Sequence, residues 1–269
     1  MNQLNLQQVL RTAIREERPV ALAVVVRNET DNGVPLAKKM LIFPGGRTEG
    51  SLGDKVLTKS VIRDAHDLLA KQRSTTRTYE FESGKKIEVY IESIVPPPPF
   101  VIIGADPDAV PIVSLAKQMG FKVLLVDHRE AFANPEKYPQ ADLTIVVCPE
   151  TLANTVRIND RTFVLVKTHN YLRDKEILKT VLKSPAVYVG QLGPKARMED
   201  LLRDLAKEGV TFSQKELDKL YGPVGLDIGA ESPEQIAISI LSEMLAVKNG
   251  RLGGLLREQT DAIHPRSET

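Results

Sequence analysis

The stretch FVIIGADPDAVPIVSLAKQMGFKVLLVDHR, residues 100–129, decides the fold of the second half of this chain. An apolar run ends at Gly104, and a polar turn leads into a helical pattern that Gly120 stops. A second apolar run ends at Asp127. Strand, turn, helix and strand at this length predict a βαβ unit. A strand ending in glycine, with an acid about twenty residues further on, is how a Rossmann nucleotide site begins.

The glycine fingerprint of dinucleotide sites, G-x-G-x-x-G, is only partly present. Its three glycine positions are taken by Gly104, Asp106 and Ala109. Asp106 brings negative charge to the place where a pyrophosphate would lie, and Pro107 beside it removes an amide donor. The pattern therefore predicts the Rossmann fold, while the altered loop argues against a bound NAD(P).

Composition narrows the class of protein. The 269 residues include 36 basic and 35 acidic side chains, and this balance gives no reason to expect a nucleic acid or an anionic membrane as partner. The single cysteine, Cys148, excludes an internal disulfide and a cysteine-rich zinc site. No apolar run approaches the roughly 20 residues that span a bilayer, and the start of the chain lacks the apolar core of a signal peptide. We therefore expect a cytoplasmic protein.

Four consecutive prolines, 96–99, mark the predicted domain boundary, because such a run favours an extended linker and cannot join a sheet ladder. Residues 1–95 predict a small α+β domain. Its predicted elements are helices 4–17 and 54–71, and strands 20–26, 39–43, 76–81 and 86–94. Residues 100–249 alternate apolar strands with helices, which predicts a Rossmann-like domain with a mainly parallel sheet. The fold class is therefore α/β, and the Gly-rich and charged end, 250–269, is expected to fray.

The second domain concentrates its polar residues where predicted strands end, which is where parallel sheets bind ligands. Its predicted strands are 100–103, 121–126, 143–147, 162–167 and 186–189, and its later helices are 171–182, 198–208, 213–220 and one that begins at Ser232. The strand-end residues are, in chain order, Gly104, Asp127, His128, Arg129, Cys148, Thr168, His169, Gly190, Gly193, Lys195 and Arg197. Five loops are thus expected to converge on one crevice.

Residues near the second strand each allow a binding and a structural interpretation. Asp127 would hold a ribose hydroxyl, or it would cap the next turn. His128 and Arg129 add positive charge for a phosphate, or Arg129 pairs with a neighbouring acid.

The later strand ends leave similar alternatives. His169 would contact a ligand or make a structural hydrogen bond, and it has no partners at metal-ligand spacing. Lys195 and Arg197 at the start of a helix predict an anion site, or a loop with solvated basic side chains. Cys148 is a candidate nucleophile, or a small apolar residue at a strand end.

Three segments resemble the XdhC/CoxI family, the accessory proteins of xanthine dehydrogenase and related molybdenum hydroxylases. They are THNYLRD at 168–174, YVGQLGPKAR at 188–197 and GPVGLDIGAESPEQIA at 222–237. The first domain is similar more loosely, in 21–26 and 40–42. The likeness covers nearly all of the second domain.

The resemblance implies a small N-terminal domain joined to a Rossmann-like domain. It implies a chaperone that holds molybdenum cofactor, promotes its sulfuration and delivers it to the enzyme. The implied partners are a molybdenum hydroxylase such as xanthine dehydrogenase, and a sulfurase. The cofactor carries a phosphate, which suits an anion-binding crevice. An exposed sheet edge or helix face could also support a homodimer.

Two motifs of the family are altered here. Typical members of the family that this chain resembles carry Gly-Ser-x-Pro-Arg after the first strand, where residues 31–36 read DNGVPL without the arginine. They carry Gly-Gly-Cys before the second helix, where residues 53–55 read GDK. The first hypothesis is a maturation factor rather than a turnover enzyme. The alternatives are an NAD(P)-dependent oxidoreductase, which Asp106 disfavours, and a partner-binding scaffold that has lost cofactor binding.

Overall fold

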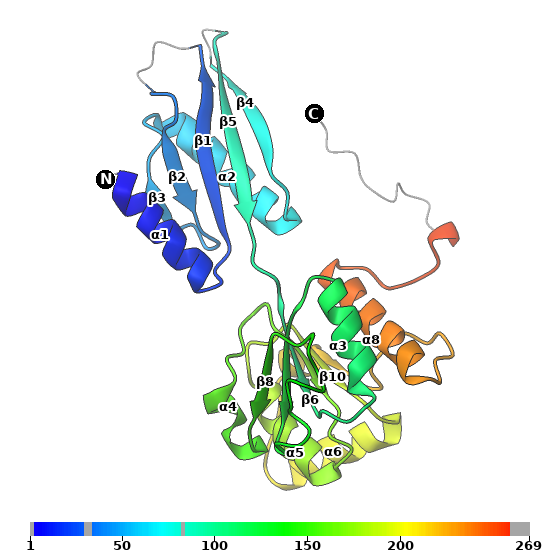
Figure 1. Cartoon of the computed structure of the whole chain (residues 1–269). Helices are drawn as coiled ribbons and strands as arrows, with labels where there is room; N and C mark the ends of the chain where they lie inside the picture. The colour runs from blue at the N-terminus through cyan, green and yellow to red at the C-terminus, as the bar shows by residue number, and fades with distance from the viewer. Residues whose placement is uncertain (1–2, 30–33, 82–83, 259–269) are drawn as a thin grey trace. The chain divides into compact units, whose positions relative to one another are not determined.

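The computed structural model describes residues 3–29, 34–81 and 84–258, and the chain divides into two compact units, Met1–Pro96 and Pro97–Thr269. Figure 1 shows the elements of each unit. Residues 31–33 of the altered DNGVPL segment, and the end of the chain from residue 259, lie outside the described residues. Among the described helices, none combines the length and apolar character needed to cross a membrane.

The first unit is a five-stranded antiparallel sheet in the order β3-β2-β1-β5-β4. Its elements are α1 (Gln3–Arg15), β1 (Val20–Asn28), β2 (Lys39–Ile42), β3 (Thr48–Gly50), α2 (Lys55–Lys71), β4 (Thr75–Glu80) and β5 (Lys86–Ile94). Alternating side chains of β1 and β2 point to opposite faces. Ala21 and Met40 pack with α2 residues, whereas Val20 and Leu41 pack with α1 residues. The two helices thus cover the two faces.

The second unit is a six-stranded, wholly parallel sheet in the order β11-β10-β9-β6-β7-β8. The strands are β6 (Pro99–Ile103), β7 (Lys122–Asp127), β8 (Leu143–Val146), β9 (Phe163–Val166), β10 (Tyr188–Gln191) and β11 (Leu220–Tyr221). Counted within this unit, the spatial order is 3-2-1-4-5-6, the Rossmann order. The predicted fold class is confirmed, and the strand order reverses between β6 and β9.

Helices cover both faces of this sheet. The helices and helical turns of this unit are α3 (Ala109–Gln118), η1 (Pro149–Thr151), α4 (Leu152–Thr155), α5 (Tyr171–Val181), α6 (Lys195–Lys207), α7 (Gln214–Leu217), α8 (Pro233–Lys248) and η2 (Leu256–Glu258). One core joins α3 and α8 to the face that carries Phe100, and the other joins α4, α5 and α6 to the face that carries Val101. α8 begins at the predicted Ser232 with a capping box: the Ser232 side chain accepts from Gln235 N, and the Gln235 side chain accepts from Ser232 N.

Several boundaries differ from the prediction for local reasons. Pro99 joins the ladder as the first residue of β6, paired with Lys122, because the carbonyl of Pro98 still accepts a bond there. The strand expected at 186–189 runs from Tyr188 to Gln191, and α6 begins at Lys195 rather than Met198. The strands β3 and β11 and the helix α4 are too short for a periodicity signal and were not predicted.

Candidate functional site

The loops at the carboxyl ends of the six parallel strands form the candidate site. At the switch point, the loops that follow β6 and β9 come into close contact. Gly104 has φ +117°, and a Cβ there would lie 2.7 Å from the Lys167 carbonyl carbon and 3.1 Å from Thr168 Cα. Glycine is therefore required for packing between the two loops, with or without a ligand.

Asp127, at the end of β7, is a buried hub with 4% of its surface exposed. One carboxylate oxygen accepts from Ala105 N and Arg129 Nη2, both at 2.9 Å. The other accepts from Arg129 N and Nε, both at 2.9 Å, and lies 3.0 Å from His128 Nδ1. These protein donors saturate a carboxylate. The geometry therefore matches the structural interpretation of Asp127 and leaves no free lone pair for a ribose hydroxyl.

The charge of Asp127 is stabilised by its donors. Burial raises the pKa of the carboxyl, but the bonds from Arg129 and Ala105 outweigh it and lower the pKa from 3.8 to about 2. Next to this hub, the Tyr138 hydroxyl donates to the carbonyls of Ala105 and Asp106, at 2.7 and 2.9 Å. Burial and the nearby carboxylates raise the pKa of Tyr138 to about 12, so it remains a donor. The loop after β6 is thus held by its own polar network.

Acidification is expected to remove about 2 kcal/mol of stability from the second unit through Asp127 alone. Because the folded pKa of about 2 lies below the ordinary 3.8, this stability is complete above roughly pH 4 and is lost as pH falls through 2. Urea unfolding of the wild type and of Asp127→Asn between pH 2 and 6 measures it. The difference between the two proteins should shrink at low pH, whereas a constant difference would refute the assignment. Asp200→Asn, on the exposed side of α6, is the control.

Two aspartates occupy the start of α3, where a dinucleotide would place its pyrophosphate. Asp106 pairs with Arg129 at 3.1 Å. Asp108 pairs with Lys167 at 2.7 Å and lies 3.3 Å from His169 Nε2. The Lys167 side chain is fully buried. Burial raises the pKa of Asp108, but the hydrogen bond from Lys167 outweighs it and lowers the pKa. The protein's own carboxylates therefore stand where a phosphate would bind.

A second buried hub lies at Asp174, in the first turn of α5. Its carboxylate accepts from Thr168 Oγ1 at 2.6 Å, Gln191 Nε2 at 3.1 Å and Arg197 Nη2 at 2.7 Å. These contacts join the ends of β9 and β10 to the starts of α5 and α6. Arg197 is thus engaged inside the protein, and a Cβ at Gly193 would lie 2.9 Å from Arg197 Cδ. The predicted anion site has one of its two cations neutralised.

Lys195, Gly190 and Cys148 were also predicted as site residues, and they lie at the same carboxyl edge of the sheet but differ in exposure and contacts. Lys195 is 75% exposed and lies 3.9 Å from Glu199, so its ammonium is available to solvent. Gly190 serves packing, because a Cβ there would lie 2.7 Å from Val224 Cγ2. Cys148 is exposed. Within the described residues, no group of three His, Cys, Asp or Glu side chains is arranged to hold a metal ion.

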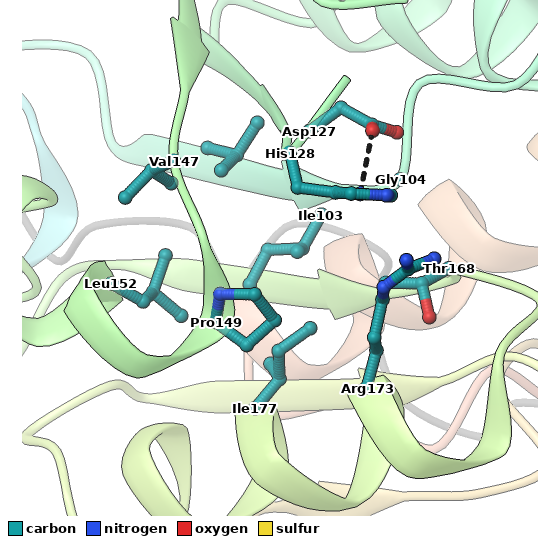
Figure 2. A pocket seen from close by; sticks show the side chains of 11 residues that line it. Ile103, Gly104, Asp127, His128, Val147, Pro149, Leu152, Thr168, Arg173 and Ile177 are labelled. Atoms are coloured by element: carbon teal, nitrogen blue, oxygen red, sulfur yellow. Dashed lines mark ion pairs between the residues drawn. The ribbon is translucent and has the colours of Figure 1, made fainter.

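A recess opens at the carboxyl ends of β6, β7 and β8, beside α4 and α5 (Figure 2). It is small and open to solvent. Its lining residues are Ile103, Gly104, Val126, Asp127, His128, Val147, Pro149, Leu152, Thr168, Arg173 and Ile177. Figure 2 shows the apolar side chains of Val147, Pro149, Leu152 and Ile177 on one side, with His128 and Arg173 reaching in from opposite elements.

The loops named from the sequence lie at one edge of the parallel sheet, but several residues that link these loops to one another were not predicted. Asp108, Lys167, Asp174, Gln191 and Arg173 were not among the predicted site residues. Lys167 stands directly before the predicted Thr168, and a lysine ending an otherwise apolar strand was an available signal. Arg173 and Asp174 follow Thr168 by five and six residues, inside the segment already singled out. Their roles depend on contacts between distant loops.

The fold and its site define a class of protein. It has a Rossmann unit in which ion-paired aspartates, Asp106 and Asp108, occupy the usual phosphate-binding loop, and a small α+β unit precedes it in the chain. Comparison with protein families agrees. Residues 100–244 match the XdhC Rossmann domain, and residues 13–80 match the XdhC and CoxI family. The chain belongs to the XdhC and CoxI family, so the resemblance of its three segments is confirmed.

Individual relatives agree with the family. The chain is 30% identical over 177 residues to a Bacillus subtilis protein named as a probable xanthine dehydrogenase subunit, covering 66% of this chain and 51% of that protein. It is 29% identical over 261 residues to the Escherichia coli "Uncharacterized protein YqeB", covering 92% and 46%. The chain thus spans about half the length of these curated relatives. A crystal structure described as a xanthine dehydrogenase from Bacillus halodurans shares the fold, with a TM-score of 0.53 and 22% identity over 94% of this chain and 97% of that one.

Proposed function

We propose that this protein is an accessory factor in the maturation of a molybdenum hydroxylase of the xanthine dehydrogenase type. In this proposal it binds molybdenum cofactor transiently and hands it to the enzyme, and it acts as a binding protein rather than a turnover enzyme. Family membership and the xanthine dehydrogenase name of the Bacillus subtilis relative support the connection to that enzyme.

One observation carries the choice of cofactor over dinucleotide. An NAD(P) site needs a free acid for the ribose and a helix start that is open to the pyrophosphate. Here the Asp127 carboxylate is already bonded to protein donors, and Asp108, paired with Lys167, occupies the start of α3. These residues do not fit a dinucleotide. Lys195 and Arg173 remain at the same edge as cations that a phosphate-bearing cargo could approach.

Titration of the purified protein distinguishes the functions. Molybdenum cofactor, released anaerobically from a molybdoenzyme, should bind saturably, while NADH and NADPH should not. Tight NAD(P)H binding would replace this proposal with an oxidoreductase. Binding of neither ligand, together with capture of a molybdoenzyme, would favour the scaffold without a cofactor, which the ion-paired loop after β6 also suits.

Lys195→Ala is expected to weaken cofactor binding about threefold to tenfold without changing stability, because one exposed charge at a helix start is lost. Lys207→Ala is a matched control, since Lys207 is an exposed lysine at the opposite end of α6 and pairs with Asp204. Equal affinities of the two variants would remove Lys195 from the site. Arg197→Ala is less informative, because it also breaks the bond to Asp174.

A further inference from the structure

Helix α8 carries apolar side chains on its outer face as well as on the face that packs against the sheet. Ile238 is 49% exposed and Leu245 is 43% exposed, whereas Ala237 and Ile240 are buried in the core with α3. Ile238 and Leu245 are seven residues apart, so they lie on the same side of the helix, and Ser242 lies between them. An exposed apolar strip of this spacing is typical of a helix that packs against a second helix.

The segment that follows α8 adds to this apolar surface. A Cβ on Gly253 would lie 3.0 Å from Leu226 Cδ1, and the Ser239 hydroxyl, in the middle of α8, donates to the Leu226 carbonyl at 2.6 Å. The chain therefore turns back toward the middle of α8 after the helix ends (Figure 1). It carries three more exposed leucines there: Leu252, Leu255 and Leu256.

The charges at the two ends of α8 have opposite signs. Glu231 and Glu234 lie at its start, and Lys248 and Arg251 lie at its end. All four side chains are exposed, and none forms an ion pair with a residue that the structure describes. Such charges favour the dipole of the helix itself, but the apolar strip between them has no role within the unit. Together, strip and charges form a surface that complements itself when a second α8 lies antiparallel.

We propose that two copies of this chain associate through α8, with the two helices antiparallel about a twofold axis that passes between residues 241 and 242. Residues 238 and 245 are equally far from this axis, so Ile238 of one copy packs against Leu245 of the second copy, and this contact occurs twice. The small side chain of Ser242 at the axis lets the helices approach closely.

The order of the charges selects this arrangement over others. In the antiparallel pair the acidic start of each α8 faces the basic end of the other, whereas a parallel pair would bring like charges together. A different protein would need the same apolar spacing and the reverse order of charges, and a second copy supplies both by symmetry. The interface goes beyond the proposed function and does not depend on it.

Sedimentation velocity of the full chain tests the apolar contact. At micromolar concentrations the wild type should sediment as a dimer of the 29.8 kDa chain. Leu245→Ala should weaken the dimer at least about tenfold, because each dimer loses two leucines from its interface. Leu172→Ala is the matched control, since Leu172 is an exposed leucine on α5, and it should leave the dimer unchanged.

Charge reversal tests whether the partner is a second copy. Glu231→Lys with Glu234→Lys makes both ends of α8 basic, and Lys248→Glu with Arg251→Glu makes both ends acidic. Each double variant alone should weaken the dimer at least about tenfold, because like charges then meet at both ends of the helix pair. An equimolar mixture of the two should recover the dimer, since opposite charges meet again.

A control and three contrary results complete the test. Lys55→Glu with Lys59→Glu, exposed on α2, changes the net charge as much as the acidic variant and should leave the dimer intact. A wild type that stays monomeric at micromolar concentrations overturns the proposal. A dimer that resists Leu245→Ala and both charge reversals does so too, as does a mixture that stays monomeric. Circular dichroism verifies that the variants are folded, and Ile238→Ala replaces Leu245→Ala if the latter is unfolded.

Discussion

Gly104→Ala is expected to destabilise the second unit by at least about 3 kcal/mol. The new Cβ would be forced against the backbone of Lys167, 2.7 Å from its carbonyl carbon, and φ +117° is unfavourable for any residue with a Cβ. Because the obstacle is backbone of the adjoining loop, no rotamer change relieves it. Urea unfolding read by hydrogen exchange of peptides from residues 97–248 measures the loss.

Gly120→Ala is the matched control for this substitution. Gly120 also has a positive φ, +81°, but a Cβ there would meet nothing within 4 Å. It should therefore cost only the conformational strain, about 1 kcal/mol. Equal losses in the two variants would show that the contact between the loops after β6 and β9 is not close.

Asp108→Ala is expected to cost about 3 kcal/mol, because it leaves the fully buried ammonium of Lys167 without its carboxylate at 2.7 Å. The effect should come from the unpaired charge rather than from lost packing, since Asp108 itself is one third exposed. Unfolding in urea at pH 7, followed by the same hydrogen-exchange peptides, measures it.

A second substitution checks the cause. Lys167→Met removes the charge and keeps a long apolar side chain, so Asp108→Ala with Lys167→Met should recover most of the lost stability. The single Lys167→Met should be milder than Asp108→Ala, because Asp108 can turn to solvent and still faces His169. A double variant as unstable as Asp108→Ala alone would contradict the buried-charge explanation.

A residue's role could be predicted from the sequence only where all its contacts come from neighbouring residues in the chain. The start of α8 at Ser232 was predicted correctly, because the capping box that fixes it is made within one turn of chain. Asp127 was left between ligand binding and a cap, since its donors come from Ala105, 22 residues away, as well as from Arg129. Binding of a ligand by the predicted residues stays a prediction.

The sequence by itself determined the Rossmann fold, the α+β character of the first unit and the family. These follow from apolar periodicity, turn residues and segments such as 222–237, which are local properties of the chain. Only the tertiary structure decided which charges are free. Asp108 meets Lys167 across 59 residues, and Arg197 meets Asp174 across 23, so strand order and not spacing decides these pairs. Because Arg197 takes the bond to Asp174, the neighbouring Arg173 lines the recess instead.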